Sequence, residues 1–172
     1  MSTAVRFKAS WGTATWIITL FTMVLIVTLA VLLIVAPRFG DHHAGGLEAL
    51  IAAGVLLIPA ITALFVPLGY ELNDEGLVVR RYGPDIRVPW REIASIEPRV
   101  WSLWKSLGLR LFGDGGLFGF AGWFWTRDLR TMRVSATRLD TLVVIHRRDA
   151  RPLILSPDDR EAFIAAVEQH IG

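Results

Sequence analysis

The sequence predicts a membrane α-helical hairpin followed by a soluble α+β domain that is mostly β, in which a β-sandwich or barrel is closed by a C-terminal helix. Hydrophobic residues make up 53% of the 172 residues and the mean hydropathy is +0.47, which is too apolar for an average soluble domain. This excess is concentrated in the first 70 residues. The later residues form short alternating runs separated by turn residues, which is typical of antiparallel strands.

The first apolar run extends from Trp16 to Ala36 (WIITLFTMVLIVTLAVLLIVA) and contains no ionisable side chain. About 20 such residues cross the ~30 Å hydrocarbon layer of a bilayer as a helix, so we predict a membrane span over about residues 14–36. The run is too long for the apolar core of a signal peptide, and the residues that follow it (PRFG) do not form a small-residue cleavage site. We therefore expect a retained anchor.

A second apolar run covers residues 47–68 (LEALIAAGVLLIPAITALFVPL) and includes Glu48, Gly54, Pro59 and Pro67. Proline inside a membrane helix kinks the helix, and neighbouring helices can accommodate the kink. We predict a second span here, which makes residues 1–69 an N-terminal segment with a two-helix transmembrane hairpin. Residues 70–172 then form the soluble domain.

Basic side chains indicate how the hairpin is oriented, because lysine and arginine gather on the cytoplasmic side of membrane spans. They flank the outer ends of the two runs at Arg6, Lys8, Arg80, Arg81 and Arg87, whereas the turn between the runs contains only Arg38. Aromatic rings that favour the membrane boundary stand at the same outer ends: Trp11, Trp16 and Tyr70. We predict a multi-pass protein of the cell (plasma or inner) membrane, with both termini and the soluble domain in the cytoplasm.

Small residues recur at helical spacing in both apolar runs. They are Thr15, Thr19 and Thr22 in the first run, and Ala49, Ala53, Ala60 and Ala63 in the second. Such stripes let membrane helices approach closely, so we expect them to face each other in the hairpin. The alternative is that threonine and alanine are simply common in membrane helices.

The soluble domain begins with YEL, the turn NDEG and LVVRRY, which predict a β-hairpin with Gly76 in the left-handed position of the turn. Further strands are predicted over residues 86–90, 93–96, 131–136, 142–147 and 152–155. A C-terminal helix is predicted from Ser156 as N-cap and Pro157 as first helical residue. Its apolar stripe is Phe163, Ala166, Val167 and His170.

Two segments in this order resemble the bacterial pleckstrin-homology-like (bacterial PH) domains: YELNDEGLVVRRYGPDIRVPWREIASIE, and TLVVIHRRDARPLILSPDDREAFIAAV after a glycine-aromatic middle. The resemblance covers roughly residues 70 to 170. It implies a PH-like fold that often follows two membrane spans, and it implies no active site. Eukaryotic PH domains that bind phosphoinositides have a basic cluster in the first hairpin loop, whereas this chain has the acidic turn NDEG, which disfavours that mode of binding.

No catalytic or cofactor motif is found in the sequence, which has no cysteine and neither a Gly-x-Ser-x-Gly nor a His-Glu-x-x-His pattern. The cluster Asp41-His42-His43 resembles metal ligands, but a specific site usually needs a third or fourth placed ligand. His146 and His170 are expected to be packed or edge residues. We expect no enzyme activity, no cofactor and no metal.

The glycine-aromatic stretch LFGDGGLFGFAGWFW, residues 111–125, lacks both the third glycine of a dinucleotide loop and the Lys-Ser/Thr of a P-loop. Strand neighbours point to opposite faces, so a run of rings this dense is expected to place some of them against bilayer or partner. The candidate contact residues, with two tryptophans from the preceding segment, are Trp101, Trp104, Phe118, Phe120, Trp123 and Trp125. The alternative is that all of these rings fill the core.

Charge excludes a nucleic-acid partner, because three of the 18 basic and two of the 16 acidic side chains precede Tyr70, which leaves 15 and 14 in the soluble domain. We predict a membrane-anchored, non-catalytic interaction or scaffold module, with no small-molecule substrate. The expected partners are the lipid bilayer and a membrane or cytoplasmic protein or a second copy of the chain. The alternatives are a module that senses lipids of the inner leaflet and an accessory subunit of a membrane enzyme or transporter.

Overall fold

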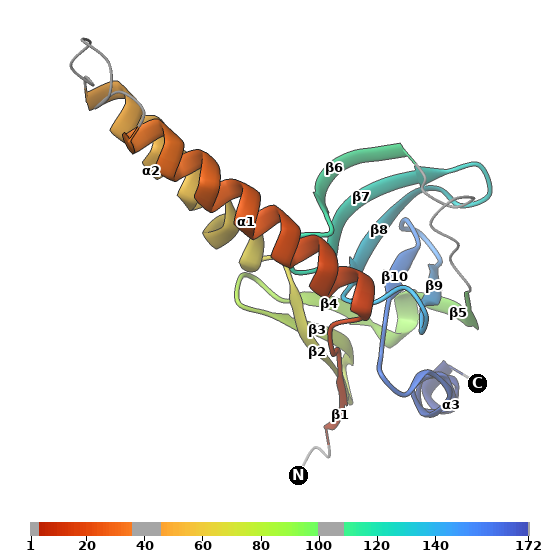
Figure 1. Cartoon of the computed structure of the whole chain (residues 1–172). Coiled ribbons are helices and arrows are strands. Elements are labelled where there is room, and N and C mark those ends of the chain that lie inside the picture. The colour runs from red at the N-terminus through yellow and green to blue at the C-terminus, as the bar shows by residue number, and fades with distance from the viewer. Residues whose placement is uncertain (1–3, 36–45, 100–108, 172) are drawn as a thin grey trace.

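The computed structural model describes residues 4–35, 46–99 and 109–171, and in these two long helices project from a β domain (Figure 1). Helix α1 (Thr13–Val35) and helix α2 (Gly46–Ala63) lie side by side and run in opposite directions. The domain consists of two β-sheets and the C-terminal helix α3 (Arg160–Ile171). It is open and does not close into a barrel, as β5 and β6 form the two ends of the larger sheet.

The smaller sheet is antiparallel and has the strand order β1-β2-β3-β4. Its strands are β1 (Val5–Lys8), β2 (Pro67–Asn73), β3 (Gly76–Arg81) and β4 (Ile86–Pro89). Strand β1 was not predicted from the sequence, because it is only four residues long and its partner β2 lies far along the chain. Since β1 pairs with β2, both long helices are inserted between two neighbouring strands of one sheet, and residues 5–8 belong to the soluble domain's sheet.

The larger sheet has the order β5-β9-β10-β8-β7-β6, in which only the β10–β8 pair is parallel. Its strands are β5 (Ile93–Pro98), β6 (Leu109–Gly115), β7 (Phe120–Thr126), β8 (Arg130–Ala136), β9 (Val143–Arg147) and β10 (Leu153–Leu155). A short 3-10 turn, Trp90–Glu92, links the two sheets. The strands expected over 86–90, 93–96, 131–136, 142–147 and 152–155 are all found, whereas β6 and β7 were not predicted as strands.

Two apolar clusters form the core of the domain. In the first, Tyr70 and Leu77 of the smaller sheet pack against Phe163 and Val167 of α3. In the second, Phe124 and Met132 lie with other buried residues of the larger sheet. The α3 stripe predicted from the sequence therefore covers the sheets as expected, except that His170 is exposed and stacks on Trp90 with the ring centroids 4.3 Å apart.

The start of α3 differs from the prediction. Asp159 caps the helix, because its Oδ1 accepts a hydrogen bond of 3.0 Å from the backbone N–H of Ala162. Ser156 is fully buried and accepts backbone N–H groups of Thr137 at 2.8 Å and Arg138 at 3.3 Å. A hydroxyl used inside the core in this way is not available as a helix cap.

Helix α1 is the described helix that is long and apolar enough to cross a membrane. The second span expected over 47–68 is not found in that form, and a multi-pass topology is not supported. Helix α2 ends at Ala63, and residues 67 and 68 already belong to β2. Pro67 explains this end, because proline has no N–H to donate and biases the preceding residue toward extended backbone.

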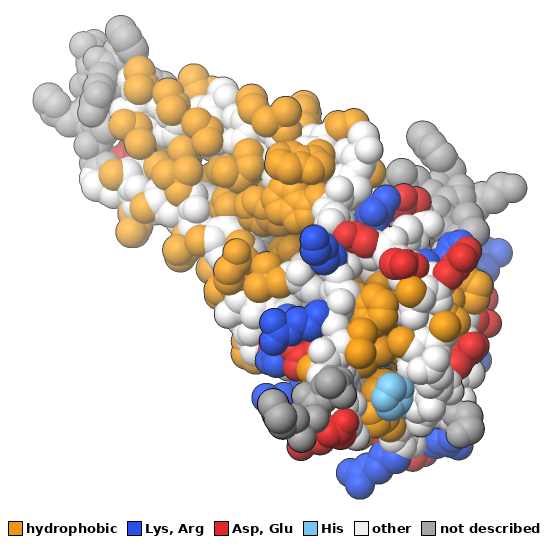
Figure 2. Space-filling model, turned by 90° about the horizontal axis from the view of Figure 1, so that it is seen from below, with side chains coloured by type: hydrophobic (Ala, Val, Ile, Leu, Met, Phe, Trp, Pro, Cys, Tyr) orange, Lys and Arg blue, Asp and Glu red, His pale blue; other side chains and the backbone are white. Residues whose placement is uncertain are grey.

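The surface of the helices differs sharply from that of the domain (Figure 2). Apolar side chains cover the helical projection, whereas lysine, arginine, aspartate and glutamate side chains gather around the domain. Outward-facing residues on α1 include Leu20, Phe21, Val24 and Leu25. A soluble protein rarely leaves so large a contiguous apolar surface uncovered.

Candidate functional site

The candidate site is the junction at which α1 and α2 meet the larger sheet. Two threonines of α1 make hydrogen bonds with the domain here. The hydroxyl of Thr15 donates to the carbonyl of Thr137 at 2.5 Å. The hydroxyl of Thr19 donates to the carbonyl of Gly116 at 3.3 Å and accepts the N–H of Phe118 at 2.9 Å. The first two turns of α1 are therefore fixed to the domain.

These contacts differ from the expected helix-to-helix stripes. Thr15 and Thr19 are buried against the domain, and Thr22 is half-buried. On α2, Ala49, Ala53 and Ala60 are exposed and Ala63 is half-buried. The buried alanines of the two helices are instead Ala30 and Ala52. The threonine spacing marked one face of α1, and that face lies against the domain rather than against the predicted alanine stripe of α2.

The turn between β6 and β7 explains the glycines of the stretch 111–125. Gly116 has a φ of +136°, and a Cβ built on it would lie 2.7 Å from Cγ2 of Ile18 on α1. A side chain at this position would push the turn away from the helix. Gly122 has a φ of +143°, and its Cβ would lie 2.2 Å from the carbonyl oxygen of Phe112 on the paired strand. The glycines thus permit close backbone approach, and no phosphate-binding loop is formed.

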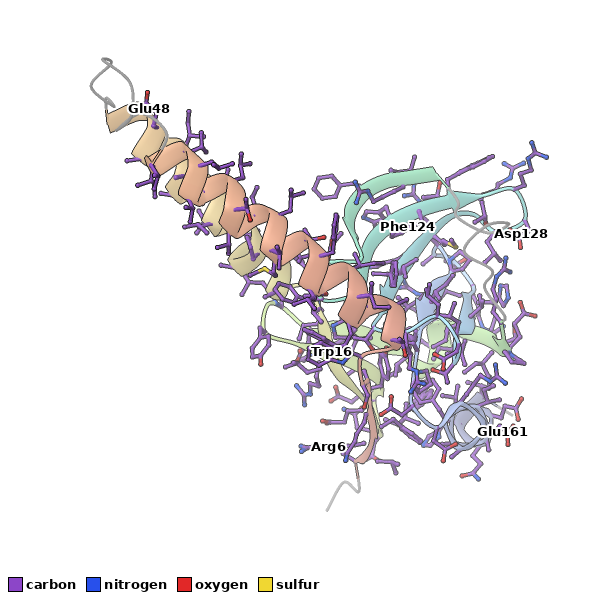
Figure 3. All side chains as sticks on the ribbon, in the orientation of Figure 1. Arg6, Trp16, Glu48, Phe124, Asp128 and Glu161 are labelled. Atoms are coloured by element: carbon purple, nitrogen blue, oxygen red, sulfur yellow. The ribbon has the colours of Figure 1, made fainter. Side chains whose placement is uncertain are left out.

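Aromatic rings surround the junction. The rings of Trp11 and Trp16 lie 4.8 Å apart in an edge-to-face arrangement, and Trp11 lies 5.7 Å from Phe118. Trp16 is 61% exposed and lies where α1 meets the domain, whereas Glu48 lies at the far end of the helices (Figure 3). This is the position at which tryptophan is enriched in proteins that enter a bilayer.

The structure separates the candidate contact residues into different environments. Phe120 is buried in the core, and Phe118 and Trp123 are half-buried. Trp125 is exposed. Trp101 and Trp104 lie outside the described residues. The stretch therefore supplies both core and surface residues, unlike the alternative in which all of these rings fill the core.

Strand β6 adds an exposed apolar residue that sequence reasoning missed. Phe112 is 77% exposed, and Leu111 beside it is also exposed. Both point outward because the β6–β7 register shifts between Arg110 and Phe112, so that strict alternation is broken. The five glycines of the stretch signalled an irregular strand, but they did not signal which rings it would expose.

A cavity of about 460 Å³ lies between the end of α2 and the β6–β7–β8 face. Its apolar wall includes Ile61 of α2, Phe65 just after α2, and Phe112 of β6. Its basic wall includes Arg81 of β3 and Arg133 of β8. The Arg81 guanidinium carbon lies 5.9 Å from the Phe65 ring centroid. Apolar and basic groups in one cavity suit an amphipathic anion.

Both cavity arginines are partly buried, and this burial lowers the pKa of each guanidinium. Burial lowers the pKa of the Arg81 guanidinium, and the positive charge of Arg133 lowers it further. Burial also lowers the pKa of Arg133, as does the nearby Arg147. Each change reports a positive charge that its surroundings do not fully compensate.

The acidic residue of the cavity lining, Asp114, does not compensate these charges. Burial raises the pKa of Asp114 to about 6, while hydrogen bonds from the backbone of Leu117 and Gly115 and the charge of Arg110 oppose that rise. A guanidinium of Arg81 or Arg133 in contact with the carboxylate would lower its pKa. Asp114 is therefore held by its own turn rather than by the two cavity arginines.

A family model described as bacterial PH domain matches residues 68–171. The chain belongs to the bacterial PH domain family. Comparison with curated proteins and with solved structures gives no match. The match covers β2 to α3 of this bacterial PH domain, so that β1 and the two long helices precede the matched region although β1 completes its first sheet.

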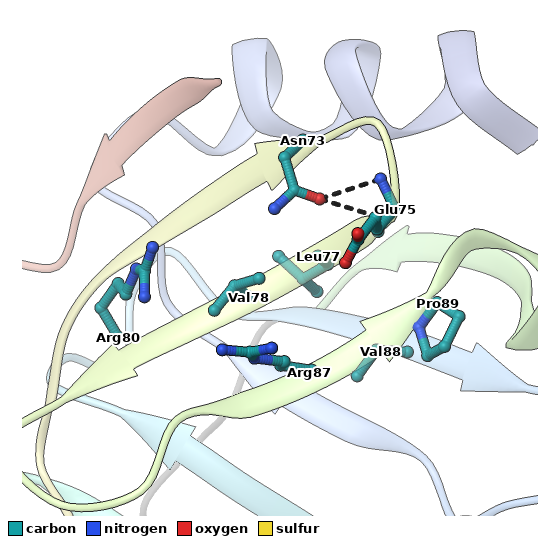
Figure 4. A pocket seen from close by; sticks show the side chains of 9 residues that line it. Asn73, Glu75, Leu77, Val78, Arg80, Arg87, Val88 and Pro89 are labelled. Carbon is teal, nitrogen blue, oxygen red and sulfur yellow. Dashed lines mark hydrogen bonds between the residues drawn. The ribbon is translucent and has the colours of Figure 1, made fainter. Parts of the chain in front are cut away.

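The β2–β3 turn of this bacterial PH domain is closed by the side chain of Asn73. The side-chain oxygen of Asn73 accepts the N–H groups of Glu75 and Gly76, each at 3.0 Å (Figure 4). In the hollow beside the turn, Arg80 is paired with Glu71 at 3.1 Å and with Asp85 at 2.7 Å. The charge of Arg80 is therefore compensated within the domain.

Within residues 4–35, 46–99 and 109–171, no group of three histidine, cysteine, aspartate or glutamate side chains could hold a metal ion. Asp41, His42 and His43 lie outside these ranges. His146 lies on β9 with its Nε2 3.0 Å from Oε1 of Glu97. The bacterial PH domain thus offers contact surfaces at the junction, and the cavity arginines are its most distinctive charged groups.

Proposed function

We propose that the protein is a membrane-anchored, non-catalytic interaction module, in which α1 holds the bacterial PH domain at the cytoplasmic face of a cell membrane. The single observation that carries this proposal is the uncovered apolar surface of α1, which continues directly into a hydrogen-bonded junction with the domain. Burial of that surface in hydrocarbon removes its contact with water.

Helix α2 is expected to share the same apolar layer. It lies along α1, and its outer residues Leu50, Leu56 and Leu57 are exposed. At ~1.5 Å per residue its 18 residues extend over about 27 Å, which approaches the ~30 Å of a hydrocarbon layer. We infer that the two helices enter the membrane together, with the junction at the level of the headgroups.

The interaction surface that this placement brings to the bilayer is the β6–β7 edge, with Leu111, Phe112 and Trp125. Exposed aromatic and aliphatic side chains beside a membrane helix gain free energy when they enter the interfacial layer. Strand β6 is the end strand of the larger sheet, and its outer side is unpaired within the described residues. The surface is therefore suited to contact rather than to catalysis.

Accessibility of single cysteines tests the placement, because the natural chain contains none. Glu48→Cys lies at the far end of the helices and should react with a membrane-impermeant maleimide on intact cells. Asp149→Cys, in the exposed β9–β10 turn, should react only after lysis. Labelling of Asp149→Cys alone on intact cells would place the domain outside and contradict the proposal.

Tryptophan fluorescence tests the contact surface. In full-length protein reconstituted with brominated phosphatidylcholine, a variant that keeps only Trp125 should be quenched. A variant that keeps only Trp90 is the control, because Trp90 lies against α3 and donates its indole N–H to the carbonyl of Asn73 at 2.8 Å. Equal quenching of the two variants, or none of Trp125, would contradict a bilayer contact.

A protein partner is the second candidate, and the free edge of β6 favours it. An extended segment of another chain can add to such an edge through backbone hydrogen bonds. In that case Trp125 stays unquenched by brominated lipid, and a proline at Arg110 of β6 should abolish co-purification of the partner. The membrane anchor itself would remain.

A further inference from the structure

The cavity between α2 and the β6–β7–β8 face contains two arginine side chains that are not paired with acidic groups of the domain. Within the described residues, neither Arg81 nor Arg133 forms an ion pair. Arg81 donates one guanidinium hydrogen bond to the carbonyl of Pro84, while its Nε is buried without a partner. Burying unpaired hydrogen-bond donors on a charged group is unfavourable, so the site is suited to an anion that accepts them.

The acidic groups beside Arg81, and beside Arg147 near Arg133, are bound by other donors. Asp85 accepts from Nη1 of Arg80 at 2.7 Å and from the backbone N–H of Arg81 at 3.2 Å. Glu92 is held by Arg147, with Nη2 and Oε2 2.5 Å apart. The cavity lining therefore carries the two guanidinium charges of Arg81 and Arg133 against the single carboxylate of Asp114.

Aromatic rings hold both guanidinium groups in place. Cζ of Arg81 lies 5.9 Å from the Phe65 ring centroid, and Cζ of Arg133 lies 5.8 Å from the Trp123 ring centroid. Cζ of Arg151, in the connection between β9 and β10, lies 5.1 Å from the same Trp123 centroid. A guanidinium over a ring keeps its N–H edges free to donate. Two such edges can bind the oxygens of one phosphate with charge-assisted hydrogen bonds.

The opposite wall of the cavity is apolar and continuous with the helices. Ile61 and Phe65 line it from the last turn of α2 and the residues just after it, and both are largely exposed like the outer surface of that helix. Phe112 stands on the β6 side. A ligand held here has a phosphate toward the sheet and apolar chains along α2. This combination is found in a phospholipid and not in a soluble phosphate.

We propose that this cavity binds one anionic phospholipid, whose phosphate is held by Arg81 and Arg133 and whose acyl chains lie along the end of α2. The inference rests on the proposed membrane placement. Anionic lipids are abundant in cytoplasmic leaflets, where they attract basic groups. The site is separate from the β2–β3 turn, whose neighbouring Arg80 is already paired.

The test uses the full-length protein in nanodiscs of equal parts phosphatidylcholine and phosphatidylglycerol, with retained lipids counted by native mass spectrometry. We expect one phosphatidylglycerol per chain. Arg133→Gln and Arg81→Gln should each lower its retention at least tenfold, to the level of phosphatidylcholine. Arg91→Gln is the matched control, since it removes the same charge from an exposed site on the 3-10 turn, and it should retain the lipid.

Two further measurements keep the outcomes distinct. Arg133→Lys preserves the positive charge but lacks the planar pair of N–H donors of a guanidinium, so it should retain an intermediate amount of lipid. This result would show that the Gln variants did not simply misfold. Glycerol phosphate at millimolar concentration should not displace the lipid, and equal affinity for the soluble anion would overturn a lipid site. If the protein inserts but retains both lipids equally, this inference is wrong while the membrane placement stands. If it does not insert, the proposed function itself fails.

Discussion

The hydroxyl of Thr19 on α1 accepts a hydrogen bond of 2.9 Å from the backbone N–H of Phe118, 99 residues later in the chain. The same hydroxyl donates to the carbonyl of Gly116 at 3.3 Å. One side chain thus satisfies both backbone groups of a turn whose glycines allow it to lie against the helix. The helical and β parts of the molecule are held together by a polar contact inside an apolar junction, where an unmade hydrogen bond is unfavourable.

Thr19→Val is expected to loosen this turn, because valine keeps the shape of the side chain but cannot make either hydrogen bond. The cost should be about 1 to 3 kcal/mol, the penalty of leaving buried backbone groups unpaired. Hydrogen–deuterium exchange of residues 116–119 in detergent-solubilised protein measures it directly. Thr19→Ser keeps the hydroxyl and should exchange like the natural chain. If both variants exchange alike, the hydroxyl does not hold the turn.

Gly122→Ala is expected to disrupt the β6–β7 pair, since the added Cβ would lie 2.2 Å from the carbonyl oxygen of Phe112. Backbone strain of this kind costs roughly 1 to 3 kcal/mol before any loss of packing. Gly54→Ala in α2 is the control, because nothing lies within 4 Å of its Cβ and alanine favours the helix. Chemical unfolding of both full-length variants should show the first less stable and the second equally or more stable than the natural chain.

Ser156→Ala should destabilise the domain by about 2 to 3 kcal/mol, because it leaves the N–H groups of Thr137 and Arg138 without their acceptor. Asp159→Ala removes the observed cap of α3 and should cost about 1 kcal/mol. Phe163→Ala should cost about 3 to 5 kcal/mol by opening the core. Urea unfolding measures the stability of the three variants. An Asp159→Ala variant less stable than the Ser156→Ala variant would contradict the assignment of Asp159 as the helix cap.

Asp114 should make stability depend on pH. Its folded pKa of about 6 lies above its ordinary value of 3.8, so the folded state binds more protons than the unfolded state between these limits. The contribution of this group to stability is therefore full below about pH 4 and is lost as pH rises through about 6. Asp114→Asn should remove that dependence and be more stable than the natural chain at pH 7.5.

Urea unfolding at pH 4.5 and pH 7.5 checks this expectation. Asp149→Asn, in an exposed turn, is the matched control and should leave the difference between the two pH values unchanged. A natural chain that gains stability over this interval through Asp114 would contradict the raised pKa.

Much of the domain could be predicted because its strands carry local signals. The Asx-type turn at Asn73 and the glycine at position 76 fix the first hairpin. Alternation of apolar and polar residues identifies β4 and β8, and a short apolar run identifies β9. Strand β1 (VRFK) also alternates, but a run of only four residues is too short to predict a strand, and its pairing with β2 comes from residues 60 or more positions away. Strand pairing between residues so far apart cannot be predicted from short segments of sequence.

The candidate site was predicted less well for the same reason. Trp125 was identified from its place in an aromatic run, but Phe112 became exposed through a register shift that depends on the backbone of its neighbour. The two cavity arginines were read from sequence only as flanking charge or strand residues. Arg81 and Arg133 come from different strands, and only the tertiary arrangement places them in one cavity.

Because both helices are inserted between β1 and β2, the domain is joined to the helical pair at two places. Residues 9–12 join β1 to α1, and residues 64–66 join α2 to β2, so each helix enters an adjacent strand through a connection of only a few residues. A single connection would let the domain rotate relative to the helices, whereas two short connections side by side resist that rotation. In the proposed placement, the tilt of the helices in the bilayer would be passed to the sheet, so that the angle at which β6 meets the lipid surface would follow the thickness of the membrane.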